Sequence, residues 1–203
     1  MTLAGLLLAS YLLGSVPTAY LVARWVKGTD IRTVGSGNVG ATNAMRAVGP
    51  WAGVVVLLID GLKGALPARW PDLVTPGAPN SWAFACALAA VLGHNFPCFL
   101  RFRGGKGVAT TLGALIGAQP HLALIALTTW FAVFLPTRYV SLASMAAGVS
   151  IPLGQLALRR APSEIALGAV LAALILVRHK TNWQRLRQGT EPRIFASVRR
   201  RTR

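Results

Sequence analysis

The chain has 203 residues, of which 54% are hydrophobic and only 13% are charged. Such a composition excludes a soluble globular domain and indicates an integral membrane protein. Lysine and arginine outnumber aspartate and glutamate by 21 to 5, an excess that fits a nucleic acid, an anionic lipid surface or an anionic substrate as partner.

Seven apolar stretches follow one another along the chain. They predict an all-α integral membrane protein, a bundle of about seven transmembrane helices with cytoplasmic glycine-rich loops, in a single membrane domain. The stretches are residues 3–23, 50–67, 81–100, 107–119, 120–136, 139–158 and 163–177. No basic residue precedes the first stretch, so we expect a retained span rather than a cleaved signal. The fourth has about 13 residues where a lipid-exposed helix needs about 20, so we expect it to be tilted, re-entrant or shielded by its neighbours.

The basic residues predict the orientation, because positively charged loops stay in the cytoplasm. With seven spans and the N-terminus outside, the cytoplasmic segments carry 17 of the 21 basic residues and the outer loops carry three. We therefore expect a cytoplasmic C-terminus, with residues 178–203 as a basic cytoplasmic tail. Contact with the phospholipid headgroups accounts for most of the basic excess, and no nucleic acid is expected as a partner.

Small and charged residues inside the stretches predict how the helices pack. Glycines such as Gly14, Gly64 and Gly113 are typical of close helix contacts. Asp60 and Lys63 are three residues apart and should face each other on one helix. This pair either serves packing alone or supports a functional site.

The loop after the first stretch contains GSGNVGATN, residues 35–43. Glycines allow backbone amides to converge on an anion, and short hydroxyl and amide side chains add donors nearby. The alternative is a flexible polar linker, but nine residues that are all small or polar except Val39 favour a phosphate or headgroup site. Arg46 follows as a candidate charge clamp. The candidate ligands here are Ser36, Gly37, Asn38, Thr42, Asn43 and Arg46.

The second polar segment is GHNFPCFLRFRGGKGVAT, residues 93–110. Gly104, Gly105 and Gly107 surround Lys106 just before an apolar stretch. A glycine-rich turn at a helix start presents free amides and the positive end of the helix dipole, which suits a phosphate. A nucleotide P-loop is excluded, because it needs Ser or Thr after the lysine and Gly107 stands there. The basic residues alone would also fit the usual charge at a cytoplasmic span end.

The third polar segment is RHKTNWQRLRQGTE, residues 178–191, and is predicted to be a short basic helix at the membrane surface. His179 and Asn182 share one face of it. A lone histidine there is often incidental, but its position level with the other two segments and the scarce acid Glu191 favour a role. Ser144, near the cytoplasmic start of the sixth stretch, is a further candidate for the same cavity. No metal site is expected, since no cluster of cysteines or histidines is present.

The three segments together resemble those of the bacterial acyl-phosphate-dependent glycerol-3-phosphate acyltransferases, membrane enzymes that make lysophosphatidic acid. GSGNVGATN, GHNFPxFLxFxGGKGVAT and HxxNxxRLxxGxE occur in the order and spacing of that family, over nearly the whole chain. The departures are Cys98, where an aliphatic residue is usual, and an arginine-rich tail. The resemblance implies a seven-helix bundle in the bacterial inner membrane with a cytoplasmic active site, with glycerol-3-phosphate and fatty acyl phosphate as substrates and no cofactor. We expect a monomer.

The resemblance also implies the roles of the candidate residues. The phosphate of glycerol-3-phosphate would be held by Ser36, Arg46 and Lys106. The acyl phosphate would be held by Thr42, the amides of Gly104 and Gly105, Ser144 and His179. Asn182 would orient the reacting groups, so that Ser36, Lys106, His179 and Asn182 form the catalytic set and the glycine-loop residues bind substrate.

An acyl phosphate is already electrophilic, so no covalent acyl-enzyme is required and proximity supplies much of the rate. The base is either His179 or an oxygen of the donor phosphate, and we favour the phosphate because no carboxylate is adjacent to the histidine. None of the three histidines is followed by Asp four or five residues later, which excludes the HxxxxD acyltransferases. A small anion transporter and a purely structural membrane subunit remain as rival functions, but no inverted repeat is apparent.

Overall fold

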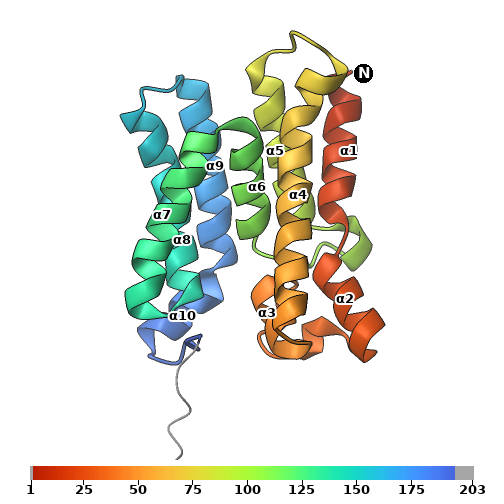
Figure 1. Ribbon diagram of the computed structural model, residues 1–203, viewed down its shortest axis with the longest axis vertical. Helices are drawn as coiled ribbons and strands as arrows, with labels where there is room; N and C mark the ends of the chain where they lie inside the picture. The colour runs from red at the N-terminus through yellow and green to blue at the C-terminus, as the bar shows by residue number, and fades with distance from the viewer. Residues whose placement is uncertain (1, 195–203) are drawn as a thin grey trace, which may run out of the picture.

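The computed structural model describes residues 2–194, and the regular secondary structure of that range consists of helices alone (Figure 1). The α-helices are α1 (Leu3–Ser15), α2 (Thr18–Lys27), α3 (Ala41–Ala47), α4 (Pro50–Val74), α5 (Asn80–Asn95), α6 (Val108–Ala118), α7 (Pro120–Thr137), α8 (Val140–Ala157), α9 (Pro162–Arg178) and α10 (Lys180–Arg187). Of two 3-10 helices, η1 (Ile31–Thr33) directly precedes the first polar segment and η2 (Cys98–Leu100) lies within the second. The predicted all-α membrane fold is confirmed.

Five segments of the described chain are long and apolar enough to cross a membrane: Leu3–Lys27, Pro50–Val74, Asn80–Leu100, Pro120–Thr137 and Val140–Ala157. A sixth is obtained if α9 and α10, which meet at a bend of 57°, count as one span. The remaining apolar helix, α6, has 11 residues, which agrees with the expected short fourth stretch. The number of helices that cross the bilayer stays a prediction.

Three predicted stretches differ from the structure, all near prolines. The first, residues 3–23, divides at Pro17 into α1 and α2, and α2 continues to Lys27. The second stretch was expected to end at residue 67, but α4 continues to Val74 with Pro67 and Pro71 inside it. A proline removes one amide donor without forbidding helical φ, so packing carries the helix past it. The third stretch instead ends early at Asn95, because Pro97 disfavours helical backbone at the residue before it, and the chain continues as η2.

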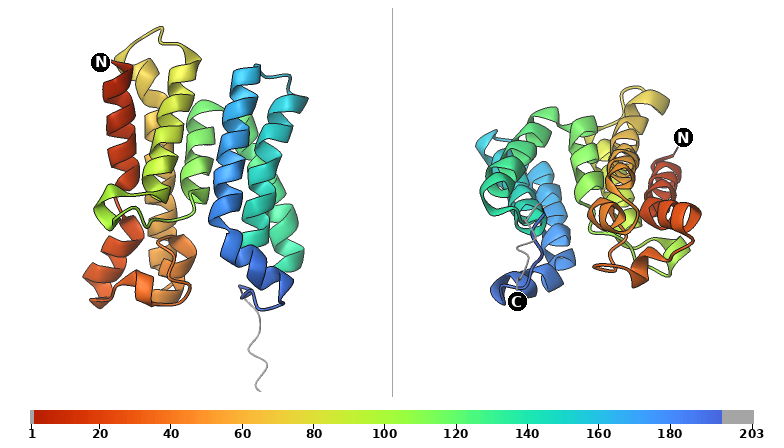
Figure 2. Two further views of the ribbon diagram at one scale, coloured as in Figure 1. Left: turned by 180° about the vertical axis from the view of Figure 1, so that it is seen from behind. Right: turned by 60° about the horizontal axis from the view of Figure 1, so that its bottom comes forward.

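Glycines allow the closest helix pairs, as predicted. A Cβ added at Gly113 on α6 would lie 1.8 Å from the carbonyl oxygen of Gly61 on α4, and one at Gly93 on α5 would lie 2.2 Å from the carbonyl oxygen of Tyr11 on α1. Only glycine fits at such contacts. The helices α1 to α6 form one group, and α7 to α10 form a second group beside it (Figures 1 and 2). The two groups meet where α6 contacts α7 and where α5 contacts α9.

Large apolar side chains point outward along the helices, as expected for a surface in contact with lipid tails. Examples that are 55% to 62% exposed include Leu8, Leu58, Leu62, Leu124 and Leu156. The short helices α2, α3 and α10 gather at the end of the molecule opposite the N-terminus (Figure 2). The polar segments singled out in the sequence belong to this end.

Candidate active site

The first glycine loop is shaped by one buried amide side chain. Nδ2 of Asn43 donates to the carbonyl oxygens of Ile31 at 3.1 Å and Val34 at 3.0 Å, and its Oδ1 accepts from the amide of Ser36 at 3.0 Å. Asn43 has no exposed surface. It therefore fixes the backbone that carries Ser36, rather than offering its own side chain to a ligand, which differs from its predicted binding role.

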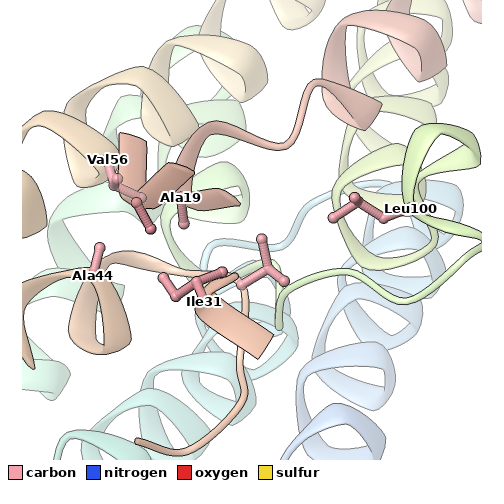
Figure 3. Close-up of a cluster of buried hydrophobic side chains, with 7 residues drawn as sticks. Ala19, Ile31, Ala44, Val56 and Leu100 are labelled. Carbon is pink, nitrogen blue, oxygen red and sulfur yellow. The ribbon is translucent and has the colours of Figure 1, made fainter. Parts of the chain in front are cut away.

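An apolar cluster beneath the loop ties the first two polar segments together (Figure 3). Ala19 of α2, Ile31 of η1, Ala44 of α3 and Val56 of α4 pack with Leu100 of η2. Burial of these side chains removes apolar surface from water and fixes the loop relative to α4 and η2. The loop is thus anchored, not a flexible linker.

The remaining candidates of this loop are more accessible. Ser36 and Arg46 are exposed, and Asn38 and Thr42 are half-buried. Gly37 has a φ of 68°, a left-handed conformation that favours glycine, and its amide donates to the carbonyl oxygen of Val34 at 3.0 Å.

In the second segment, the backbone of Gly104 and Gly105 is already hydrogen bonded. Their amides donate to the carbonyl oxygens of Asn95 at 3.3 Å and His94 at 3.0 Å. Their carbonyl oxygens accept from the guanidinium of Arg178 at 2.7 Å and 3.0 Å. The prediction of two free amides for a phosphate therefore disagrees with this geometry, because both donors serve to fold the turn.

The same turn contacts the first loop. A Cβ added at Gly105 would lie 2.1 Å from Nε2 of His94 and 2.6 Å from the carbonyl oxygen of Val39. Glycine is needed here because the first loop, the end of α5 and the turn before α6 converge at this point. The first and second polar segments are thus in direct contact, which agrees with the prediction that both lie on the same side of the membrane.

Lys106 joins the second segment to the third. Its ammonium donates to Oδ1 of Asn182 on α10. Burial lowers the pKa of Lys106 to about 8; the carboxylate of Glu191 opposes the shift, while Arg185, Arg178 and Arg46 add to it. The charge of Arg46 thus acts on Lys106, so that α3 faces the same site.

Glu191 is the centre of a buried network in the third segment. Its carboxylate accepts hydrogen bonds from Oγ of Ser141 at 2.7 Å, Nδ2 of Asn182 at 2.6 Å and Nε of Arg185 at 2.7 Å. Burial alone would raise the pKa of Glu191, but these donors and the charge of Arg185 lower it. The carboxylate is therefore ionised and holds α8, α10 and the following turn together.

His179 lies at the junction of α9 and α10 and is 3% exposed. Its Nδ1 is 2.8 Å from the carbonyl oxygen of Ile175, so the proton is assigned to Nδ1 and Nε2 is the acceptor. Burial and the nearby charge of Lys106 lower the pKa of His179 to about 4. The ring is neutral near pH 7.

Ser144 is 3% exposed and lies one helical turn after the start of α8. Its hydroxyl donates to the carbonyl oxygen of Val140 at 2.7 Å and accepts from Nε1 of Trp130 at 3.3 Å. In this structure the hydroxyl of Ser144 therefore forms its hydrogen bonds with its own helix and with the indole of Trp130.

Two residues proved more central than the sequence indicated. Arg178 was counted only among the basic residues of the tail, yet it fixes the glycine turn and lies over the ring of Phe96, 5.2 Å from its centroid. Glu191 was noted as a rare acid, but its contact with Asn182 was not foreseen. For Glu191, the sequence did contain a signal, because a carboxylate is scarce in this basic segment. For Arg178 it contained none, since the contact of its guanidinium with the glycine turn is apparent only in the fold.

Asp60 and Lys63 form the predicted pair, with 2.7 Å between Oδ1 and Nζ, and both are buried. Lys63 also donates to the carbonyl oxygen of Val16, at the break between α1 and α2 where Pro17 has no amide. His94 Nδ1 lies 3.8 Å from the same Asp60 oxygen. The pair thus stabilises the helix break that leads to the first loop.

Chemically, the site is a cationic surface with few acids. The charges of Arg178, Arg185 and Arg46 all act on Lys106, and Glu191 is the carboxylate that opposes them. A partly buried lysine and planar guanidinium groups suit anionic oxygens, above all phosphate. The three polar segments of the sequence thus meet at one cationic surface.

Comparison with known proteins gives consistent results. The sequence profile of the family described as glycerol-3-phosphate acyltransferase matches residues 4–189. The glycerol-3-phosphate acyltransferase of Geotalea daltonii is 46% identical over 189 residues, covering 92% of this chain and 94% of its own. That of Thermus thermophilus is 46% identical over 193 residues, covering 95% of both chains.

Two crystal structures of PlsY, an integral membrane glycerol 3-phosphate acyltransferase, share the fold. The form with glycerol 3-phosphate has a TM-score of 0.89 at 42% identity, and the lysophosphatidic acid form has a TM-score of 0.84 at 39% identity. Each alignment covers 95% of both chains.

Proposed function

The chain belongs to the glycerol-3-phosphate acyltransferase family, an integral membrane family of phospholipid biosynthesis, and from this membership we propose a specific reaction. A fatty acyl group passes from acyl phosphate to the sn-1 hydroxyl of glycerol-3-phosphate, giving lysophosphatidic acid and inorganic phosphate. The observation that carries the proposal is Lys106, half-buried, bonded to Asn182 and near three arginines. An anion site next to apolar helices suits two phosphorylated substrates, one of them with a fatty chain.

The proposed division of the site follows accessibility. Ser36 and Arg46, both exposed, and Lys106 bind the phosphate of glycerol-3-phosphate. Thr42, Ser144 and His179 bind the acyl phosphate, and Asn182 orients the acceptor. Gly104 and Gly105 act through the shape of their turn, since their amides are engaged.

In the proposed step, the sn-1 oxygen attacks the acyl carbon as the bond between that carbon and the phosphate oxygen breaks. The hydroxyl proton passes to the departing phosphate, which leaves as inorganic phosphate. Lys106 and the arginines offset the charge that grows on the leaving group. Because the donor is already activated, correct placement of the two substrates provides much of the acceleration.

His179 is a poor candidate for the base. Its pKa of about 4 is far below the working pH, where the ideal catalytic base would titrate. We propose that neutral His179 uses its Nε2 acceptor to orient a hydroxyl or a protonated phosphate oxygen. The His179→Gln variant should then keep turnover within about tenfold of wild type, the size of one neutral hydrogen bond. A loss of several thousandfold in kcat, with KM for both substrates unchanged, would instead identify His179 as the base.

The reaction itself is tested with purified protein in lipid vesicles, palmitoyl phosphate and labelled glycerol-3-phosphate, without coenzyme A or added metal. Wild type should form lysophosphatidic acid and Lys106→Ala should form little. Asp72→Ala, at an exposed position on α4, is the matched control and should retain activity. If folded wild type forms no product from acyl phosphate but does so from another donor, the donor proposed here is wrong.

We further propose a bacterial inner-membrane location with the N-terminus outside, the site and the C-terminus facing the cytoplasm, and a monomer as the working unit. The distribution of basic residues supports the orientation. Both substrates are then available on the side where the polar segments lie.

A further inference from the structure

A buried polar cluster lies beneath the point where the first two polar segments meet. It consists of Asp60 and Lys63 of α4 and His94 near the end of α5, which are 2%, 3% and 9% exposed. We call these three residues the polar cluster. Lys63 connects it to the break between α1 and α2, whereas His94 contacts the glycine turn of residues 104–107.

The ring of His94 lies between the carboxylate of Asp60 and the glycine turn. Its Nδ1 is 3.8 Å from Oδ1 of Asp60, and its Nε2 faces the turn, where a Cβ added at Gly105 would be 2.1 Å away. The backbone makes a second link, because the carbonyl oxygen of His94 accepts from the amide of Gly105 at 3.0 Å. A displaced His94 would therefore displace the residue that directly precedes Lys106.

The cavity beside the cluster also extends to the first glycine loop. Its volume is about 10 Å³, and its lining includes Asp60, His94, Gly105 and the loop residue Val39. Such a volume holds about one water molecule, so neither substrate fits between these groups. The cluster therefore acts on the site through the two segments and not by contact with a substrate.

Helix α4 links the polar cluster to the helix that carries Arg46. Seven residues before Asp60, Gly53 packs against α3, and a Cβ added there would lie 2.7 Å from Cβ of Met45. Two helical turns separate Gly53 from Asp60, a rise of about 10 Å on one face of the helix. One helix thus holds α3 at one point and, through His94, the glycine turn at another.

This connection matters because Arg46 and Lys106 repel each other. Burial is the main reason why the pKa of Lys106 is low, and the charge of Arg46 adds to the shift. Two like charges separate unless the fold holds them, whereas a phosphate between them gains from both. A fold that keeps the two cations at the required separation in advance therefore increases the affinity for the phosphate.

From this geometry we propose that Asp60 is a positioning residue for glycerol-3-phosphate. Through His94, it holds the turn of Lys106 at the separation from the first loop that the phosphate requires. The assignment rests on the reaction proposed above, in which this phosphate lies between Lys106 and the first-loop residues Ser36 and Arg46.

The test measures binding and turnover separately. Calorimetry of purified protein in detergent, without donor, gives the Kd of glycerol-3-phosphate, and rates in vesicles give KM for each substrate. The main variant is Asp60→Asn combined with Lys63→Met, which leaves no unpaired charge in α4. We expect Kd and KM for glycerol-3-phosphate to rise about tenfold, a typical coupling between residues in contact. KM for the acyl phosphate should change by less than about twofold, because Ser144 and His179 lie in the other helix group.

His94→Gln tests the link between Asp60 and the turn. It should raise the Kd of glycerol-3-phosphate by a similar factor, and its addition to the double variant should change Kd little further, because residues that act through one contact are not additive. Asp72→Asn, at an exposed acid on α4, is the matched control and should bind as wild type does. Melting temperatures of all variants separate lost affinity from lost stability.

A wild-type Kd in the double variant would overturn the proposal. Equal increases in KM for both substrates would also overturn it, since they indicate a general loosening of the fold. So would losses from His94→Gln and from the double variant that multiply when combined. Folded wild type that binds no glycerol-3-phosphate would instead refute the proposed reaction.

Discussion

At the scale of single residues, the site depends on a lysine whose charge is maintained against partial burial. Lys106 has a pKa of about 8, so it is protonated below that pH and loses its charge above it. Its bond to Asn182 and the nearby Glu191 carboxylate favour the charged form, and burial opposes it. The residue is therefore poised to respond to an anionic ligand.

This pKa predicts a pH dependence. In wild type, kcat/KM for glycerol-3-phosphate should fall by about tenfold per pH unit above pH 8, because deprotonation removes the charge that attracts the phosphate. Lys106→Arg stays charged at all these pH values and should show a lower but flatter profile. Steady-state rates between pH 6 and about 10 provide the measurement. An unchanged decline in Lys106→Arg would assign the titration to another group.

From the sequence, the types of residue at the site were easier to predict than the contacts that these residues make. The sequence singled out Lys106, His179 and Asn182 as candidates, and the structure brings Lys106 and Asn182 into contact. The sequence did not predict that the Asn43 side chain would hydrogen bond to the backbone of its own loop. A polar side chain next to glycines can either bind a ligand or hold the loop in shape, and the local pattern does not distinguish the two roles. Which donors remain free depends on distant carbonyl groups that no local pattern reveals.

At the scale of elements, the position of α10 depends on Glu191. The carboxylate connects Ser141 on α8 with Asn182 and Arg185 on α10. Since Asn182 also accepts from Lys106, a shift of α10 would be transmitted to the glycine turn before α6.

Glu191→Gln should therefore weaken both stability and activity. The new amide group would oppose a donor of Asn182 or Arg185, and a buried unpaired donor costs about 1–3 kcal/mol. We expect a melting temperature lower by roughly 2–10 °C and a kcat reduced by at least about tenfold. Thermal unfolding in detergent and turnover in vesicles provide the two readouts. Asp72→Asn, an exposed acid on α4, is the control.

The pH dependence of stability has a definite sign. The pKa of Glu191 is lowered from 4.5 by its donors, so its stabilisation is present above 4.5 and is lost as the pH falls through the lowered value. Wild type should thus lose more stability than Glu191→Gln when the pH is taken from 6 to about 3. Equal losses would show that other carboxyl groups dominate acid unfolding.

The break between α1 and α2 is stabilised by the ion pair of Asp60 and Lys63 within α4, because Lys63 also donates to the carbonyl oxygen of Val16. Lys63→Met leaves Asp60 buried without its partner and leaves the carbonyl of Val16 without the lysine donor, so we expect a loss of about 3–5 kcal/mol. The double variant Asp60→Asn, Lys63→Met removes both charges and should recover much of that loss. Unfolding monitored by helix content compares the three proteins. A double variant less stable than Lys63→Met would contradict this account.

Helix boundaries were less predictable than helix positions. The apolar pattern located every long helix, but Pro67 suggested an end that α4 passes by seven residues, and the stretch from 81 to 100 divides at Pro97. Tertiary packing decides whether a proline ends a helix or is carried within it. The sequence alone contains no measure of that packing.

At the scale of the whole molecule, composition predicted the fold class, and the structure confirms a helical membrane protein. The sequence did not reveal the division into two helix groups, because it depends on contacts between helices far apart in the chain. Small residues indicated that close contacts exist but not which partners make them.

The orientation is the prediction that belongs to this scale. In a variant whose Cys86 and Cys98 are replaced by serine, a cysteine at Asn80 should react with an impermeant maleimide in intact cells, since the loop before α5 is expected outside. A cysteine at Gln188, after α10, should react only once the membrane is opened. Both positions are exposed. The reverse pattern would overturn the assignment based on positive charge.

The short helix α6 changes how the two substrates meet. Its 11 residues rise about 16 Å, roughly half the thickness of a hydrocarbon core, and Lys106 directly precedes it. If the proposed site lies at that helix end, it is set deeper in the bilayer than the ends of the longer helices. On the proposed reaction, we expect the soluble substrate to reach a water-filled recess below the lipid surface, so that the reactive end of the donor can stay within its leaflet. The catalysis would then depend on water entering the membrane rather than on lipid leaving it.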